Sequence, residues 1–482
     1  MVSYGVYVPL CVIFMNQGYI IQSSMHQSFI TLHKHHSRIY VNFLVIAICC
    51  YSFESFCQEP SRDELIQKRV ELQKSFITLY DEERYQPGVL IATEVLSLTE
   101  ELFGTDSTKM ISPLNNLASA YFMIGEYEKA TETFFRCVEL IENVQNMLTP
   151  ELIQPLNGIG LSLNRTEQYN QAVEVFKRAL HINYVNDGFY NLDQIDIQDS
   201  LTESFIGLKD LDGANHHQEF QVRIYKNHYG TENQEVDTSL QKLADWYKRS
   251  GQIFSERLIY EEIYKRQSNR QNQTIKDLVN TLKNLSFSHR REGLDIYDSV
   301  SPLKKALQRL EDDPGNHFRL KLEVLLDLGD TYFSYGKVQS GMQAYQESWG
   351  LIEEDSSLKT EIENRFSEPV KVRNIRIPRI YSTGDESLEN RYYKQGFISI
   401  RFDIDTRGRA RNIKIIESDP DGLLDKEAEL AIKRSVYRPV HIEGEIQPSK
   451  DLITRHEFQY YAEEQAISEP EILDQPLENP MT

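Results

Sequence analysis

Hydrophobic positions between about residues 61 and 355 follow a helical spacing that repeats about every 42 residues. The clearest unit has Leu114, Leu117 and Tyr121 on one helix face, followed by Phe134 on a second helix. Apolar residues at i, i+3 and i+7 give each first helix one face that must be buried. The pattern predicts helix pairs that are stable only when stacked as an α-solenoid.

A shift of 42 residues from this unit finds Leu156, Ile159 and Gly160 at matching positions. We count seven units between residues 61 and 355, three with the full pattern and four degenerate. Small residues such as Gly160 let neighbouring helices approach closely. Gly125 and Gly336 suit the tight turns between paired helices.

The pattern changes near Glu368. Residues 356–396 contain prolines and scattered charges, which predict a linker with one possible strand at 370–377. From Phe397 to Asp405 apolar and polar residues alternate, which is typical of a half-buried strand.

Further elements follow this first strand. A hairpin turn at 405–408 leads to a second strand at 413–416, and helical spacing then runs from Leu424 to Val436. Pro439 is expected to end that helix, and a last strand follows at about 451–460. The sequence therefore predicts a mainly α protein whose solenoid precedes a small α+β module at 397–461, in the order strand, strand, helix, strand.

The repeat spacings resemble those of the tetratricopeptide family, although the period of 42 exceeds the usual 34. In that family the inner groove is lined by the first helix of each pair. By this resemblance the residue after the leading Leu faces the groove. These residues are Asn115, Asn157, Asp199, Gln241 and Lys283. Amide side chains there could hydrogen-bond an extended peptide backbone, whereas the alternative is that they are simply solvated helix positions. Lysines are sparse at these positions, so a basic clamp for a carboxylate terminus is not expected.

The C-terminal module resembles the TonB C-terminal family over about 368–461. The resemblance rests on Gly396-Phe-Ile-Ser-Ile-Arg-Phe-Asp-Ile-Asp405, on Ile-Ile-Glu-Ser at 415–418 and on Tyr-Arg-Pro at 437–439. It implies a periplasmic domain that pairs an exposed strand edge with a segment of an outer-membrane receptor. The implied edge is the last strand, with Leu452, Thr454, His456 and Phe458. Alternatively, these residues only complete a small sheet.

The first 57 residues are interpreted as a signal peptide or leader. Basic and histidine residues at 33–38 precede an apolar run at 39–53, and cleavage is expected after Cys57. The true start could be Met1 or Met25. We therefore expect export to the periplasm, the alternative being an inner-membrane anchor at 39–53 with the rest of the chain facing the periplasm.

Charge and cysteine content narrow the function further. The chain of 482 residues has 73 acidic and 52 basic side chains, and its net charge of −21 disfavours nucleic-acid partners. Four of five cysteines fall in the leader, and Cys137 is expected to be a buried structural thiol. Residues 462–482 are acidic, without lysine or arginine, and are expected to form a disordered tail.

No sequence motif for catalysis, metal binding, a phosphate loop or a cofactor is present. His216-His217 is the nearest approach to a metal motif, and solvated or structural roles are preferred for it. We therefore expect a non-enzymatic scaffold with protein or peptide partners in the cell envelope, and no small-molecule substrate. Two alternatives remain open: a TonB-type energy transducer for outer-membrane transport, and an enzyme with an unrecognised site.

Overall fold

The computed structural model describes residues 60–381 and 391–463. The predicted leader, 1–57, lies outside these residues, as does the predicted tail beyond its first two positions. The helices are α2 (Arg62–Asp81), α3 (Tyr85–Phe103), α4 (Ile111–Met123), α5 (Tyr127–Val144), α6 (Ile153–Arg165), α7 (Tyr169–Asp187), α8 (Ile195–Gly207), α9 (Leu211–Tyr229), α10 (Gln234–Arg249), α11 (Ile253–Asn269), α12 (Ile275–Glu292), α13 (Ile296–Asp312), α14 (Phe318–Ser334), α15 (Val338–Glu354), α16 (Lys359–Phe366) and α17 (Asp425–Arg434). Short 3₁₀ turns occur at Thr108–Met110, Pro150–Leu152, Leu192–Gln194 and Ser356–Leu358.

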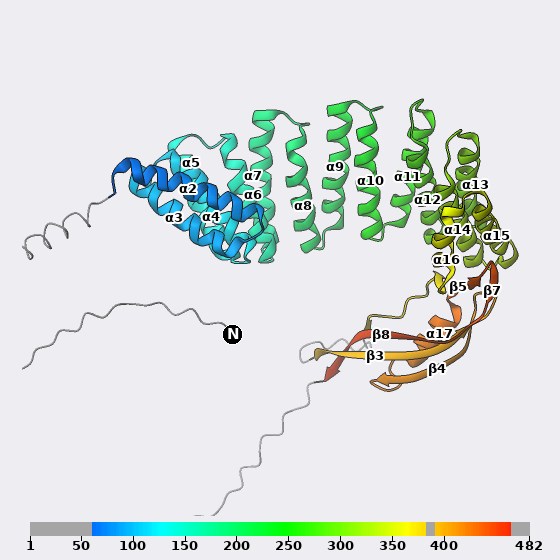
Figure 1. Ribbon diagram of the computed structural model, residues 1–482. Coiled ribbons are helices and arrows are strands. Elements are labelled where there is room, and N and C mark those ends of the chain that lie inside the picture. Colours follow the sequence, from blue (N-terminus) through cyan, green and yellow to red (C-terminus); the bar gives the residue numbers. More distant parts are fainter. Residues whose placement is uncertain (1–59, 382–390, 464–482) are drawn as a thin grey trace, which may run out of the picture. The chain divides into compact units, whose positions relative to one another are not determined.

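Fourteen consecutive helices, α2 to α15, lie between Arg62 and Glu354, a range that the structure describes throughout (Figure 1). This confirms the α-solenoid expected from the repeating pattern. Gly125 and Gly336, both with positive φ, occupy the predicted turns within pairs. These left-handed backbone conformations explain why glycine is found at both turns.

The chain divides into two compact units, one ending at Ile124 and the other beginning at Gly125. In the first unit α2 packs against α3, and α3 packs against α4. The helix α2 begins with a capping box in which Ser61 and Glu64 each bind the other's backbone N–H. Phe76 and Leu114 lie in the buried interior of this unit.

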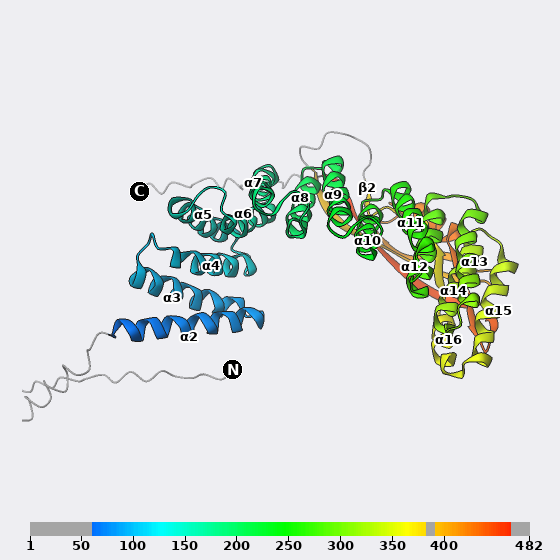
Figure 2. The ribbon, with the colours of Figure 1, turned by 90° about the horizontal axis from the view of Figure 1, so that it is seen from above.

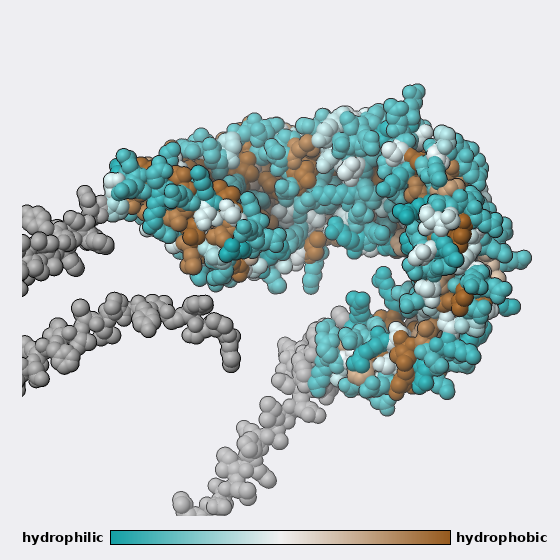
Figure 3. Space-filling model, in the orientation of Figure 1, coloured by the Kyte–Doolittle hydropathy of each residue, from teal (hydrophilic) through white to brown (hydrophobic). Residues whose placement is uncertain are grey.

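In the second unit each helix from α5 to α15 packs against the next, so that the pairs follow one another in chain order (Figure 2). Neighbouring helices approach closely where a small residue on one helix faces a large side chain on the other. A Cβ atom at Gly160 would overlap the ring of Phe176, and one at Gly329 would overlap the ring of Tyr345. Burial of such rings removes apolar surface from water and stabilises the helix pairs. Hydrophilic residues cover most of the face seen in Figure 3.

The C-terminal module is built on a four-stranded sheet with the order β2-β8-β3-β4. These strands are β2 (Ile380–Tyr381), β3 (Arg391–Ile404), β4 (Ala410–Asp419) and β8 (Ser449–Glu463). The strand β3 is antiparallel to both β4 and β8, and α17 packs against β4 and β3. The predicted strand, strand, helix, strand order is therefore present. Two further strand pairs join β1 (Val370–Arg373) to β5 (Val436–Arg438), and β6 (Val440–Ile442) to β7 (Glu445–Gln447).

The predicted end of the helix at Pro439 is wrong. The helix α17 ends at Arg434, and Val436 belongs to β5, which pairs with β1. Val436 is buried among residues of α14, α15 and α16, so a tertiary contact replaces the last helical turn. A chain segment that must pair with a distant strand cannot remain helical.

The predicted linker, 356–396, contains regular structure. It holds α16, β1, β2 and the start of β3 within the described residues. Ile362 and Phe366 of α16 are buried against Tyr345 and Leu351 of α15. Val436 of the C-terminal module therefore extends the hydrophobic core of the last helix pair, while the module's sheet has a core of its own.

Candidate functional site

A cavity of about 640 Å³ lies between α10, α11 and α12. Half of its lining residues carry amide side chains, and only one is hydrophobic. The lining consists of Gln234, Asp237, Thr238, Gln241, Ile263, Gln267, Gln273, Asp277, Asn280, Thr281, Lys283 and Asn284. We call this cavity the amide groove. It can offer both hydrogen-bond donors and acceptors to a ligand.

Helix geometry positions these side chains. Thr238 and Gln241 are three residues apart on α10, and Asn280 and Asn284 are four residues apart on α12, so each pair lies on one helix face. Thr274 caps the start of α12 by accepting a hydrogen bond from the backbone N–H of Asp277 at 3.2 Å. The groove is thus formed by fixed helix positions.

Several amides in this groove have unused hydrogen-bonding capacity. Within the described residues, the side chains of Asn280 and Asn284 make no hydrogen bond. Gln267 is only 6% exposed, and its Oε1 is buried without a partner. Because leaving a buried polar atom unpaired is costly, the Oε1 of Gln267 favours a polar ligand, and the two partly exposed asparagines are free to bind one as well.

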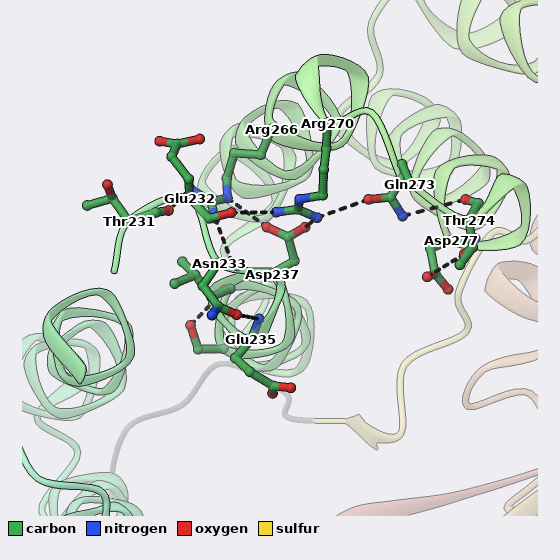
Figure 4. A network of polar contacts seen from close by, with 12 residues as sticks. Thr231, Glu232, Asn233, Glu235, Asp237, Arg266, Arg270, Gln273, Thr274 and Asp277 are labelled. Carbon is green, nitrogen blue, oxygen red and sulfur yellow. Dashed lines mark hydrogen bonds and ion pairs between the residues drawn. The ribbon is translucent and has the colours of Figure 1, made fainter. Parts of the chain in front are cut away.

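One wall of the groove is held by an ion-pair network (Figure 4). Asp237 is buried and binds Arg266 Nε through Oδ1 and Arg270 Nη1 through Oδ2, each at 2.6 Å. The same arginines donate to the backbone carbonyls of Thr231, at 2.5 Å, and Glu232, at 3.3 Å. These contacts tie the start of α10 to the end of α11, so we assign the network a structural role.

A smaller cavity of about 220 Å³ adjoins the amide groove and shares Lys283 and Asn284 with it. It is also lined by Lys248, Phe287 and Arg290. The Nζ atom of Lys248 and the guanidinium of Arg290 each lie 5.3 Å from the centroid of the Phe287 ring. Neither cation forms an ion pair among the described residues, so this end of the groove has cationic character beside an aromatic ring.

The expectation that cations are sparse along the groove is therefore incomplete. Lys248 lies seven residues after Gln241, and Arg290 lies seven residues after Lys283. That spacing returns a side chain to the same helix face two turns later. Sequence reasoning considered one position per repeat and missed them, together with Gln267, Asn280 and Asn284.

The predicted groove residues have different environments. Gln241 lines the amide groove, and its Nε2 donates to Tyr260 Oη at 3.1 Å. Lys283 lines it too, in an ion pair with Glu323 at 2.5 Å. Asp199 lies elsewhere and accepts from Gln218 and forms an ion pair with Lys242, at 3.0 and 2.5 Å. Gln241 and Lys283 thus line one groove, whereas Asp199 is paired within the protein, and partner binding at these positions stays a prediction.

The remaining two asparagines are mostly enclosed. Asn115, in the first compact unit, is 5% exposed, and its Oδ1 has no partner. Asn157, on α6, likewise has a buried Oδ1 without a partner. Neither lines the amide groove. A role for them in partner binding stays a prediction.

The predicted edge residues lie on β8. Leu452, Thr454, His456 and Phe458 alternate with exposed residues, and Phe458 is buried in the module's core. His456 Nε2 lies 2.9 Å from the backbone oxygen of Pro378. A role for these four residues in partner binding stays a prediction.

Other residues considered for chemistry have structural environments. Burial raises the pKa of the Cys137 thiol to about 12, which suppresses its reactivity. Burial, with smaller effects of His216 and Lys177, lowers the pKa of His217 to about 4. His217 Nδ1 lies 2.6 Å from Gln198 Oε1. Among residues 60–381 and 391–463, no group of three or more His, Cys, Asp or Glu side chains is arranged to hold a metal ion.

Comparison with known proteins supports the module's assignment. The family model of the Gram-negative bacterial TonB protein C-terminal domain matches residues 389–457. No curated protein matches the chain. No helix within the described part of the chain is both long and apolar enough to span a bilayer.

Two solved structures illustrate the similarity of the helical region. The TPR-like repeats of a kinesin light chain from Podosopora anserina are 16% identical, with 44% of this chain and 100% of that chain covered and a TM-score of 0.37. PilF of Pseudomonas aeruginosa is 14% identical, with 53% and 95% covered and a TM-score of 0.32.

Proposed function

We propose that this protein is a non-catalytic binding scaffold of the Gram-negative cell envelope. In this proposal the helical repeats hold an extended segment of one protein partner. The C-terminal module binds a second partner by adding a strand beside β8.

The observation that carries the first part is the set of unpartnered amides in the amide groove. An extended peptide exposes one N–H and one C=O per residue, and an Asn or Gln side chain can bind both kinds of group. Asn280 and Asn284 have this capacity unused on one face of α12. Because the amides would hydrogen-bond to the backbone of the bound peptide and not to its side chains, we expect the groove to tolerate varied partner sequences.

The second part is supported by the position of β8 in the sheet. Its outer neighbour β2 pairs only through Ile380 with Gln459 and Tyr381 with Tyr460. Residues 452–458 of β8 therefore have no strand on their outer side within the described residues. An unpaired edge is a template for an added strand.

The match to the TonB C-terminal family supports an envelope location and also favours a second candidate function. This candidate is a TonB-type energy transducer, anchored in the inner membrane through residues 39–53. Both functions use the same β8 edge, and they differ in whether the leader is removed. The scaffold proposal predicts that it is removed.

The test of groove binding uses the double variant Asn280→Ala/Asn284→Ala. Tagged protein is expressed in the native bacterium, and co-purifying envelope proteins are quantified by mass spectrometry. We expect the double variant to lose at least about tenfold of one specific partner, since two hydrogen-bonding amides are removed. Partners of the C-terminal module should be retained.

The matched control is Asn272→Ala, at an exposed position just before α12 that does not line the groove. It should co-purify the same partners as the unaltered protein. Equal recovery of every partner by the double variant and the control, with both folded, would refute the groove as a binding site.

A further inference from the structure

A second large cavity, of about 700 Å³, lies in the C-terminal module beside β8. It is enclosed by the segment from Asn374 to Arg379, by Ile432 of α17 and by Thr454, Arg455 and His456 of β8. Four of its lining residues are cationic and one is a histidine, whereas none is acidic. The basic residues are Lys371, Arg376, Arg379, Arg455 and His456. We call this cavity the basic groove.

The positive charge of the basic groove is not balanced by the protein. Arg376 and Arg379 form no ion pair among the described residues. Arg455 has only Glu457, at 3.7 Å on the same strand, where both side chains are at least half exposed. Four cations without firm carboxylate partners are unexpected in a chain of net charge −21. An anionic ligand would supply the opposite charge that the protein does not.

One of these cations is held in place. The Arg455 guanidinium lies 3.6 Å from the centroid of the Phe397 ring on the neighbouring strand β3. The stacking therefore holds the Arg455 side chain toward β3, away from the outer edge of β8.

The open edge of β8 beside the groove favours a ligand in extended conformation. The backbone N–H of Gln459 points outward and donates to the carbonyl of Arg379 at 2.7 Å. Backbone groups in a strand alternate between its two edges, so those of Arg455 and Glu457 point to the same outer side. These backbone groups could pair with an extended chain whose acidic side chains meet the groove.

We propose that the basic groove binds an extended acidic segment of a partner protein. The segment lies along the outer edge of β8, and its carboxylates pair with Arg376 and Arg379. This inference rests on the proposed strand addition at β8 and adds a charge requirement to it. Charge complementarity supports an acidic occupant, and the open edge supports an extended one.

The test uses three fluorescein-labelled peptides of ten residues and measures binding to the full chain by anisotropy. One peptide alternates Glu and Thr, the second alternates Gln and Thr, and the third is the Glu peptide N-methylated at alternate residues. We expect the Glu peptide to bind roughly tenfold more tightly than the Gln peptide. N-methylation should abolish binding, because it removes the N–H groups that a strand needs.

Variants locate the charge effect. Arg376→Gln/Arg379→Gln should reduce binding of the Glu peptide to the level of the Gln peptide. Both arginines are exposed, so folding should be retained. The control Arg407→Gln/Arg411→Gln removes the same charge from the β3–β4 hairpin and should leave binding unchanged.

The remaining outcomes separate the two proposals. Equal binding of the Glu and Gln peptides, both lost on N-methylation, overturns the acidic requirement and leaves strand addition standing. Binding by none of the forms overturns both. Binding that appears only in a chain truncated after Glu463 overturns the partner proposal, because the acidic residues 464–482 of the chain itself then occupy the groove.

Discussion

Arg438 of β5 forms a two-point ion pair with Asp330 of α14, although the two residues are 108 positions apart. The distances are 2.9 Å from Nε to Oδ1 and 2.7 Å from Nη2 to Oδ2. Tyr345 Oη also donates to Asp330, and the guanidinium donates to the carbonyl of Arg365. The pair fixes the C-terminal module to the last helix pair.

Breaking this ion pair should destabilise the protein. Asp330→Asn leaves the Arg438 cation buried without its partner, and we expect a loss of about 3–5 kcal/mol in the free energy of unfolding. Replacing both residues, as Asp330→Leu/Arg438→Met, should cost less than the single change. Chemical denaturation monitored by circular dichroism measures both. Arg411→Gln, in an exposed ion pair with Asp405, serves as the control and should change stability by less than about 1 kcal/mol.

Acidification should weaken the same contact through His441. Its ring is 5% exposed and lies 4.4 Å from the Phe366 ring, centroid to centroid. Burial lowers its pKa to about 4, with a further lowering by Arg438 and an opposing effect of the hydrogen bond to Pro439. The unfolded pKa is about 6.5. The unfolded state therefore binds more protons between these values, and stability falls as pH falls through this window.

The expected loss from His441 is at most about 3 kcal/mol between pH 7 and pH 4. His441→Phe keeps an aromatic ring and removes the titrating group, so its stability should depend less steeply on pH. Urea denaturation at pH 7, 6, 5 and 4 tests this. An unchanged slope in the variant would show that His441 is not responsible. Burial also lowers the pKa of His217 to about 4, so His217 makes a separate contribution to the pH dependence of stability. A variant at His217 serves for comparison.

The close contact between α14 and α15 predicts opposite effects at two glycines. Gly329→Ala places a Cβ against the Tyr345 ring and should destabilise the protein by about 1–3 kcal/mol. At Gly350 of α15 a Cβ meets nothing within 4 Å, so Gly350→Ala should stabilise it by about 0.5–1 kcal/mol. Thermal denaturation of both variants should show shifts of opposite sign.

The sequence predicted the solenoid well because its signal is local and repeated. Leu114, Leu156 and Leu240 recur at multiples of 42 residues, and each is buried. Alternation at Ile398, Ile400 and Phe402 predicted β3 for the same reason. Both patterns depend only on neighbouring residues.

Contacts between distant segments could not be predicted in this way. The helix α17 ends at Arg434 because the following strand β5 pairs with β1. Residues 356–366 are helical because they are buried against α15. The basic groove is likewise assembled from the segment before β2, from α17 and from β8. The net charge of −21 gives no indication of this local cluster of basic residues.

Export of the protein can be tested by fractionating the native bacterium and sequencing the N-terminus of the purified chain. A soluble envelope protein that begins near Gln58 is expected, because the leader at 1–57 is interpreted as cleaved. Recovery in the inner membrane with residues 39–53 intact would favour the energy transducer instead. A cytoplasmic protein would contradict both.

The central claim is that one chain has two separate protein-binding surfaces. Site-specific photo-crosslinking in the native bacterium tests it most directly, with a photoreactive residue at Asn284 in the amide groove or at Thr454 beside the basic groove. We predict a light-dependent adduct at each position, with two different partners, and none at the control positions Asn272 and Arg407. Absence of adducts at both Asn284 and Thr454, in variants that fold and are present at normal levels, would contradict the account.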